Sequence, residues 1–581
     1  MKGFIAAAAA VLPSIASAAP QACKQYFFDT IPASLDLVWY PCNQTFECAR
    51  LSVPLNPLEP NNGLRSEIPI IKYPANKSDE YKGIILTNPG GPGGLGISYI
   101  LNTGAAIANF TGPGWDIIGF DPRGMGYSVP NGATGFTNLT APAARNATYI
   151  PRSQLTKRAI RSDHYGLEIP PRPDSWIDTI YQMGADFNVL LQANANGDNQ
   201  AVPYMTTPNV AFDMLQIAKA DARSRGLCED TVLVNYYGVS YGTVVGQTFT
   251  SLYPQHVGRF VIDSVVDLKD WYEGNPIRSA MNHSDEGIAQ FFTRCFDAGP
   301  EKCSFFTGRT SHAIRDRFNN LMAQFDAPKA IEQNWANATV VQYAQEVIKN
   351  VIIIVPYNAL NSFPPLADTL TTIEALVQSN NVTIESMTEI FYQWSPPADA
   401  AAPERPENVF ETWCSDSIAN TEYVGSHKPL PRDLIDTVRE FSVATGERFI
   451  QVYGVCSQLD LRPKWRFNGT YGATTKTPVL FIGVSKDPIT PIENAELARK
   501  RHPGSKMIYV DAVGHGIVGQ RNWCVYDKVR AYYQDLVLPG HDNRCGYGDI
   551  PFEWMPSSAA EKRSLDGNYR HSIARLPYFP L

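Results

Sequence analysis

The sequence lacks the features of several large classes of protein. It contains neither a C-x-x-C nor an H-E-x-x-H motif, the patterns of thiol redox proteins and of many zinc enzymes. No apolar run approaches the roughly 18 uninterrupted residues of a membrane-spanning helix. The net charge of −8 provides no basic excess for binding nucleic acid or an anionic membrane. No internal repeat is visible. We therefore expect a chain with neither nucleic acid nor a membrane as partner.

The first nineteen residues have the pattern of a secretory signal peptide. Lys2 supplies the positive start, residues 4–12 form a short apolar run, and residues 16–18 read Ala-Ser-Ala, a small-residue cleavage site. We therefore expect a secreted, extracellular protein. Neither pattern nor composition indicates an oligomer, and a monomer is expected.

All ten cysteines lie after this segment, and an even number in an exported chain favours disulfides over metal ligands. Short loops favour three pairs, a longer loop makes a fourth plausible, and the last pair is only what remains. In that order the pairs are Cys42–Cys48, Cys295–Cys303, Cys524–Cys545, then Cys414–Cys456, then Cys23–Cys228. Glycosylation is expected at some of nine N-x-S/T sequons, at Asn43, Asn76, Asn109, Asn138, Asn146, Asn282, Asn337, Asn381 and Asn468.

Solid apolar runs alternate with helical patterns, which is typical of a doubly wound α/β protein whose parallel strands are covered on both faces. The predicted strands are 49–55, 67–73, 83–87, 115–120, 232–237, 259–266, 477–484 and 506–510. The predicted helices are 176–193, 207–225, 286–296, 311–325, 340–354, 433–444, 494–501 and 522–537, with Pro-rich joints around Pro364 and Pro396.

The alternation of strand and helix is interrupted twice, which gives the expected organisation of the chain. An irregular insertion covers residues 129–207, and amphipathic helices dominate residues 268–475. We therefore expect a core of residues 20–267 and 476–545, a large helical cap inserted at 268–475, and a C-terminal tail at 546–581.

The central motif is Gly238-Val-Ser-Tyr-Gly242, a G-x-S-x-G pattern that follows a predicted strand and precedes a small-residue helix. In such a turn the glycines permit a tight strand-to-helix reversal, and Ser240 is exposed as a nucleophile. The motif is short enough to arise by chance, so the partners of the serine decide its meaning.

A serine nucleophile needs a base, and the base needs an orienting carboxylate. Asp487 and His515 follow the last two predicted strands, 477–484 and 506–510, in the chain order Ser, Asp, His of α/β-hydrolases. Parallel strands end at one edge of the sheet, so we expect the three side chains to meet there. Asp263 and Asp511 also lie near strand ends, and Asp263 is the rival for the acid role.

The glycine-rich run from Asn88 to Gly94 supplies a candidate oxyanion hole. Its backbone N–H groups can approach a developing negative charge. The predicted donors are the N–H groups of Gly91 and Tyr241, with Gly90 as an alternative to Gly91.

These motifs resemble those of the prolyl iminopeptidase and tripeptidyl aminopeptidase group of α/β-hydrolases. The resemblance lies in the glycine run 90–94, in Asp121-Pro-Arg-Gly-Met-Gly-Tyr-Ser128, in Gly238-Val-Ser-Tyr-Gly-Thr243, and in the segment 477–545. One departure is Asn88, which stands where the family often has His. The resemblance implies the α/β-hydrolase fold, with a mostly parallel doubly wound sheet and a large helical cap.

The resemblance also implies an exopeptidase that acts near a free N-terminus, without metal or organic cofactor. In such enzymes carboxylates of the cap receive the substrate ammonium, and Asp416 and Glu411 are the candidates, with Asp270 and Glu273 behind them. Asp121 and Arg123 are interpreted as a structural pair that supports the oxyanion loop.

Two other functions are compatible with the sequence. The same triad serves an esterase or lipase-like enzyme, so the substrate is either a peptide or a small ester. A non-catalytic binding protein on a hydrolase fold is the remote alternative.

Overall fold

The structure is a computed structural model that describes residues 28–43, 45–132, 165–194, 201–273, 277–326, 337–394, 408–417 and 423–553. The predicted signal peptide, Cys23, Asn138, Asn146 and Pro396 lie outside the described residues. Within the described ranges, no helix combines the length and the apolarity that a membrane span requires.

In the described part of the chain, the strands form one sheet with the order β1-β2-β3-β5-β4-β6-β7-β8-β9-β10. From β5 onward neighbouring strands pair in parallel, and β1, β2 and β3 add an antiparallel edge. The strands are β1 (Tyr40–Cys42), β2 (Phe46–Pro54), β3 (Arg65–Tyr73), β4 (Gly83–Asn88), β5 (Trp115–Phe120), β6 (Val234–Ser240), β7 (Val257–Val265), β8 (Leu480–Lys486), β9 (Lys506–Val513) and β10 (Arg544–Cys545).

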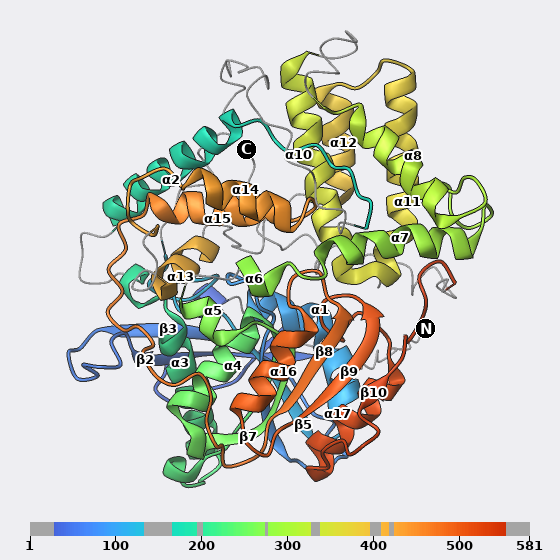
Figure 1. The fold of residues 1–581 in the computed structure, drawn as a ribbon. Helices are drawn as coiled ribbons and strands as arrows, with labels where there is room; N and C mark the ends of the chain where they lie inside the picture. The colour runs from blue at the N-terminus through green and yellow to red at the C-terminus, as the bar shows by residue number, and fades with distance from the viewer. Residues whose placement is uncertain are drawn as a thin grey trace, which may run out of the picture.

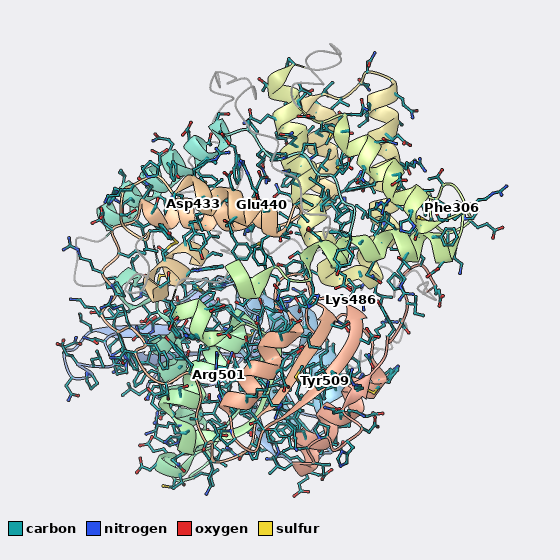
Figure 2. The ribbon with its side chains drawn as sticks, viewed as in Figure 1. Phe306, Asp433, Glu440, Lys486, Arg501 and Tyr509 are labelled. Carbon is teal, nitrogen blue, oxygen red and sulfur yellow. A yellow bond between two sulfur atoms is a disulfide. The ribbon has the colours of Figure 1, made fainter. Side chains whose placement is uncertain are left out.

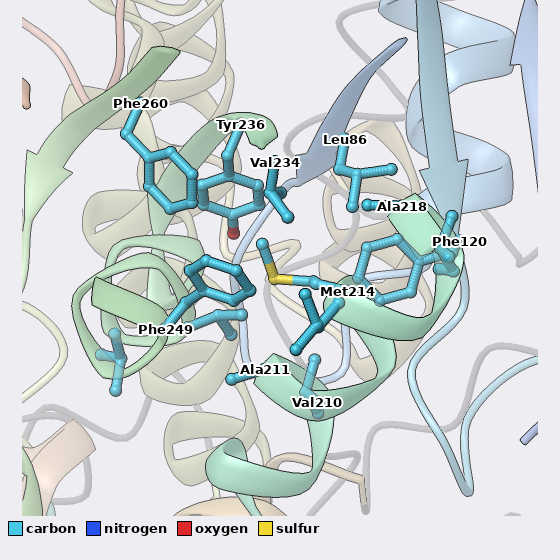
Figure 3. Close-up of a cluster of buried hydrophobic side chains, with 14 of the residues drawn as sticks. Leu86, Phe120, Val210, Ala211, Met214, Ala218, Val234, Tyr236, Phe249 and Phe260 are labelled. Carbon is cyan, nitrogen blue, oxygen red and sulfur yellow. The ribbon is translucent and has the colours of Figure 1, made fainter. Parts of the chain in front are cut away.

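Helices cover both faces of this sheet (Figure 1). On one face, α1 (Gly96–Thr111) and α17 (Trp523–Asp535) share an apolar cluster with the strands. On the other, α3 (Thr207–Ser224), α4 (Tyr241–Leu252) and α16 (Ile492–Arg501) do the same. Figure 3 shows the second cluster, in which Met214 of α3 and Phe249 of α4 pack under Tyr236 and Phe260 of the sheet.

The largely apolar character of the central strands follows from this arrangement. Every residue of β4 and β5 is buried, because both faces of these strands are covered by helices. The sequence-based prediction of a doubly wound, mostly parallel α/β sheet is therefore confirmed.

Ten helices are described between β7 and β8, in the segment that we call the cap region (268–475). They are α5 (Leu268–Tyr272), α6 (Ile277–Ala280), α7 (Ser284–Ala298), α8 (Ser311–Ala323), α10 (Ala338–Ile354), α11 (Ala359–Gln378), α12 (Ile384–Trp394), α13 (Asn408–Ser417), α14 (Arg432–Phe441) and α15 (Gly446–Ser457). Most of them lie above the ends of the parallel strands (Figure 1). In Figure 2, Lys486 at the end of β8 lies at the boundary between the sheet and the cap region, whereas Arg501 and Tyr509 lie farther from the helices of the cap region.

The helices of the cap region form two groups, each with its own apolar cluster. One group contains α7, α8, α10, α11 and α12. The other contains α13, α14 and α15 and includes α2 (Ser175–Asn194), which comes from the predicted insertion 129–207. The long helix of that insertion thus packs on the cap region.

The prediction of a Pro-rich joint around Pro364 is wrong. Pro364 and Pro365 lie inside α11. A proline has a φ that suits a helix, and its cost is a lost hydrogen bond and a steric clash. Burial of neighbouring side chains, including Phe363 and Leu366, against the other helices compensates for that cost.

Four of the predicted disulfides are present, namely Cys42–Cys48, Cys295–Cys303, Cys414–Cys456 and Cys524–Cys545. Cys228 is exposed and is not bonded to any described cysteine. Since its expected partner Cys23 is outside the described residues, the fifth pair stays a prediction.

Candidate active site

Ser240 occupies a sharp turn between β6 and α4. Its backbone has φ 58° and ψ −125°, a conformation that is unfavourable for a residue with a side chain. A Cβ at Gly238 would lie 2.6 Å from the carbonyl oxygen of Gly242, and a Cβ at Gly242 would lie 2.5 Å from that of Asn88. Both glycines of the motif are therefore required by close backbone approach.

The structure brings His515 together with Asp487. The Nδ1 atom of His515 lies 2.9 Å from Oδ2 and 3.0 Å from Oδ1 of Asp487. Asp487 is fully buried, and its Oδ1 also accepts hydrogen bonds from the N–H groups of Ile489 and Thr490 at 3.0 and 2.9 Å. These donors fix the carboxylate in the orientation in which it holds the imidazole.

The second ring nitrogen of His515, Nε2, is suited to act as a base. This atom is buried and has no hydrogen-bond partner among the described residues. The cap region holds the same residue, because the N–H of His515 donates to the carbonyl of Tyr357 at 2.8 Å. The two rings also contact each other edge to face, with centroids 4.9 Å apart.

Two residues at the end of β7 support the histidine loop. The hydroxyl of Ser264 donates to Oδ2 of Asp487 and accepts from the N–H of Gly516, both at 2.7 Å. The Oδ2 atom of Asp263 accepts from the N–H of Ile517 at 2.8 Å and from the hydroxyl of Tyr237 at 2.7 Å.

Asp263 was the rival for the acid role, and the structure places it elsewhere. Its carboxylate holds the residue two positions after His515, while Asp487 contacts the imidazole itself. Burial raises the pKa of Asp263 to about 6, although its hydrogen bonds from Ile517 and Tyr237 oppose the shift. Asp511, also near a strand end, pairs with Lys486 at 3.0 Å.

The glycine-rich loop lies directly against the nucleophile. A Cβ at Gly90 would stand 2.7 Å from the Cβ of Ser240 and 3.1 Å from the nitrogen of Tyr241. The N–H of Gly90 donates to the side chain of Asn88 at 2.9 Å. No backbone hydrogen bond from Gly91 N–H occurs within the described ranges. The geometry therefore favours Gly91 over Gly90 as the donor that pairs with Tyr241.

Ser240, His515, Gly90 and Gly91 line one cavity with a volume of about 280 Å³. This volume is at the small end of the range for ligand sites. The cap region supplies residues 357–361 to its wall, and the chain after β10 supplies residues 547–549 and Pro551.

Asp121 and Arg123 do not form a pair with each other. Arg123 is fully buried and forms its ion pair with Asp213 of α3. Asp121 accepts hydrogen bonds from the N–H groups of Ile97 and Tyr127, both at 3.1 Å, and so holds the start of α1 beside the loop. The predicted Asp121–Arg123 pair is thus replaced by an Arg123–Asp213 pair.

The residues predicted to receive the substrate amine are buried away from the cavity wall. Asp416 accepts hydrogen bonds from Trp271 Nε1 at 2.9 Å and from the N–H of Thr207 at 3.0 Å. Burial raises the pKa of Asp416 to about 6, against the effect of these bonds. Glu411 is also buried, and neither residue lines the cavity; nor do Asp270 and Glu273. A role in amine binding stays a prediction for all four residues, and the burial of Asp416 and Glu411 disfavours it for these two.

Sequence reasoning did not identify Ser264, Tyr357 or the segment after Cys545. Ser264 has a backbone φ of 57°, which no sequence pattern announces. Tyr357 belongs to a short helical turn between α10 and α11, and it reaches His515 only through the packing of the cap region.

The known proteins to which the chain is similar in sequence include peptidases. Residues 442–545 match the family described as TAP-like protein. The tripeptidyl aminopeptidase of Streptomyces lividans is 25% identical over 499 residues, which cover 84% of this chain and 81% of that protein. The serine protease Hip1 of Mycobacterium tuberculosis is 26% identical over 238 residues, 39% of each chain.

Solved structures are more distant. An α/β hydrolase from a deep-sea metagenome library has a TM-score of 0.31 at 10% identity and covers 82% of this chain and 97% of its own. The proline iminopeptidase of Mycobacterium smegmatis has a TM-score of 0.28 at 12% identity, with 80% and 91% covered. The fold is therefore assigned from the strand order and the helices on both faces. With a serine elbow, a TAP-like segment and similarity over most of its length, the chain has the α/β-hydrolase fold and is similar to the tripeptidyl aminopeptidases.

Proposed function

We propose that the protein is a secreted serine exopeptidase of the tripeptidyl aminopeptidase type, which cleaves peptide bonds near a free N-terminus. One observation carries the proposal: the imidazole that Asp487 holds keeps a buried, partnerless Nε2 atom beside the cavity that Ser240 lines. The relatives named tripeptidyl aminopeptidase support the peptide substrate. The apparent signal peptide and the disulfides support secretion.

The proposed reaction is acyl transfer through a covalent intermediate. His515 accepts the hydroxyl proton of Ser240 as the oxygen attacks the substrate carbonyl, and then gives the proton to the leaving amine. The N–H groups of Gly91 and Tyr241 bind the oxyanion. Water, activated by the same histidine, releases the N-terminal fragment. Asp487 holds the histidine tautomer and stabilises its charged form.

The Ser240→Ala variant tests the nucleophile. We expect turnover to fall by about 10⁴-fold or more, because the acyl-enzyme cannot form. Labelling by a fluorophosphonate should be lost while the melting temperature is kept. Ser251→Ala, at the far end of α4, is the control and should behave as the wild type. Full turnover in Ser240→Ala would refute the mechanism, and a wild-type protein that fails to label would favour a non-catalytic role.

A substrate panel tests the reaction class. Tripeptidyl amides with a free N-terminus should be cleaved, and their N-acetylated forms should be poor substrates. Short-chain esters provide the comparison. Hydrolysis of esters alone would replace the peptidase with an esterase that uses the same serine.

A further inference from the structure

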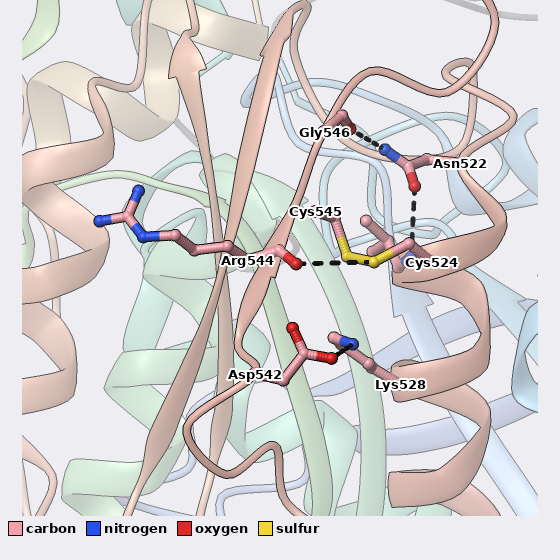
Figure 4. Close-up of a disulfide and its surroundings, with 8 residues drawn as sticks. Asn522, Cys524, Lys528, Asp542, Arg544, Cys545 and Gly546 are labelled. Carbon is pink, nitrogen blue, oxygen red and sulfur yellow. Dashed lines mark hydrogen bonds and ion pairs between the residues drawn. A yellow bond between two sulfur atoms is a disulfide. The ribbon is translucent and has the colours of Figure 1, made fainter.

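The chain after the last strand forms one wall of the catalytic cavity. The disulfide Cys524–Cys545 ties β10 to α17, and the side-chain amide of Asn522 donates to the carbonyl of Gly546 at 2.7 Å (Figure 4). Gly548 packs so closely that a Cβ there would lie 2.7 Å from the carbonyl oxygens of both Gln520 and Arg521. The wall is thus fixed to the elements that carry the histidine loop.

The same segment then reaches the cap region. Pro551 lines the cavity, and the buried ring of Phe552 lies 6.3 Å from that of Phe291 in α7. Residues 546–552 therefore run from the sheet to the cap across one side of the cavity. The segment is therefore held in place at both of its ends.

This segment also carries the acidic group of the cavity. Among the described residues that line the cavity, Asp549 is the one carboxylate, and Arg521 is its companion of opposite charge. Their side chains are 38% and 35% exposed, and the nearest charged atoms lie 4.0 Å apart. At this distance and exposure the pair is loose, so the carboxylate retains capacity for a second cation. The other polar side chains of the wall, such as Asn358 and Asn361, are neutral.

An exopeptidase that requires a free N-terminus must bind an ammonium group inside its site. Moving such a charge out of water is costly unless an opposite charge receives it. Asp416 and Glu411 are buried and do not line the cavity. We propose that Asp549 receives the α-ammonium of the substrate and thereby selects peptides with a free N-terminus; this inference rests on the proposed function.

Asp549→Asn tests the assignment with a pair of substrates that differ in one group. For a tripeptidyl amide with a free N-terminus, KM should rise by about tenfold, the effect of losing one partly desolvated charge pair. For the N-acetylated form, kcat/KM should change little, because that substrate carries no charge to lose. Asp549→Glu should recover part of the affinity for the free amine.

Asp542→Asn is the matched control. Asp542 precedes β10, is 92% exposed, and pairs with Lys528 instead of lining the cavity (Figure 4). The Asp542→Asn variant should have wild-type kinetic constants for both substrates. A wild-type KM for the free amine in Asp549→Asn would overturn the assignment, as would an equal loss on both substrates.

The outcomes separate this assignment from the proposed function. If the wild type cleaves the free-amine and the N-acetylated substrate equally well, or cleaves only esters, the proposed function itself fails. If the wild type requires the amine and Asp549→Asn leaves that requirement intact, only the role of Asp549 fails. If a peptide with a free C-terminal carboxylate is bound and its C-terminal amide is not, Arg521 receives a carboxylate and the assignment is refuted.

Discussion

At the scale of single residues, the active site concentrates backbone strain in two serines. Ser240 and Ser264 end β6 and β7 with φ values of 58° and 57°. Such values cost a residue with a side chain roughly 1 kcal/mol or more. Ser240 thereby presents its hydroxyl at the cavity, and Ser264 thereby bridges Asp487 and Gly516. The conformation of Ser264 therefore positions the acid and the histidine loop relative to each other.

Two substitutions of Ser264 distinguish the role of its hydroxyl from that of its backbone conformation. Ser264→Ala and Ser264→Gly both remove the bridge, and each should lower kcat by about tenfold with KM nearly unchanged. Glycine also relieves the positive φ, so the Gly variant should melt at a higher temperature than the Ala variant. Wild-type kcat in the Gly variant would show that the bridge is dispensable.

At the scale of elements, the central sheet could be predicted and the cap region only in part. Strands β4 and β5 are largely apolar runs, and this local pattern is sufficient to identify them. Ser240 ends β6, and Asp487 and His515 follow β8 and β9, so parallel topology places all three at one edge of the sheet. Helix α11 was missed because prolines in a sequence predict the end of a helix. Whether a helix tolerates them is decided by tertiary packing. The contribution of Asp549 was missed because no local pattern places a C-terminal segment against a distant loop.

The disulfide that anchors the final strand gives a prediction at this scale. Replacing Cys524 and Cys545 by serine opens a link between residues that are 21 apart in sequence, which should cost about 3 kcal/mol of unfolding free energy. KM for free-amine substrates should also rise, because Asp549 loses its anchor. Denaturant unfolding and kinetics measure both effects.

The pair Cys42–Cys48 provides the control for this substitution. It joins β1 and β2 at the opposite edge of the sheet, with a separation of 6 residues. Its removal should cost about 2 kcal/mol and leave KM unchanged. Equal increases in KM for the two double variants would indicate a general loss of structure rather than a local one.

At the scale of the whole molecule, the cap region and the core are joined by charged groups as well as by the cavity wall. His283, just before α7, lies 2.9 Å from Glu286 of the same helix and 3.1 Å from Glu493 at the start of α16. Hydrogen bonds to Glu286 and then to Glu493 raise the pKa of His283 from 6.5 to about 9. The charged imidazole therefore links the cap region to the core.

This link predicts a dependence of stability on pH. Because the folded-state pKa of His283 is raised, its contribution is complete below pH 6.5 and is lost as pH rises from 6.5 through about 9. His283→Gln should lower the melting temperature at pH 6 and have little effect above pH 9. His427→Gln, which alters an exposed pair with Asp460, is the control and should be neutral at both values. An identical melting difference for His283→Gln at both values would contradict the role of this charge.

The hydrogen bond from His515 N–H to the carbonyl of Tyr357 makes the position of the proposed general base depend on the cap region. If proteolytic nicking or partial unfolding displaces residues 355–358, the histidine loop loses that bond and the edge-to-face ring contact together. Damage of this kind therefore silences the enzyme. It does not produce an open, indiscriminate hydrolase.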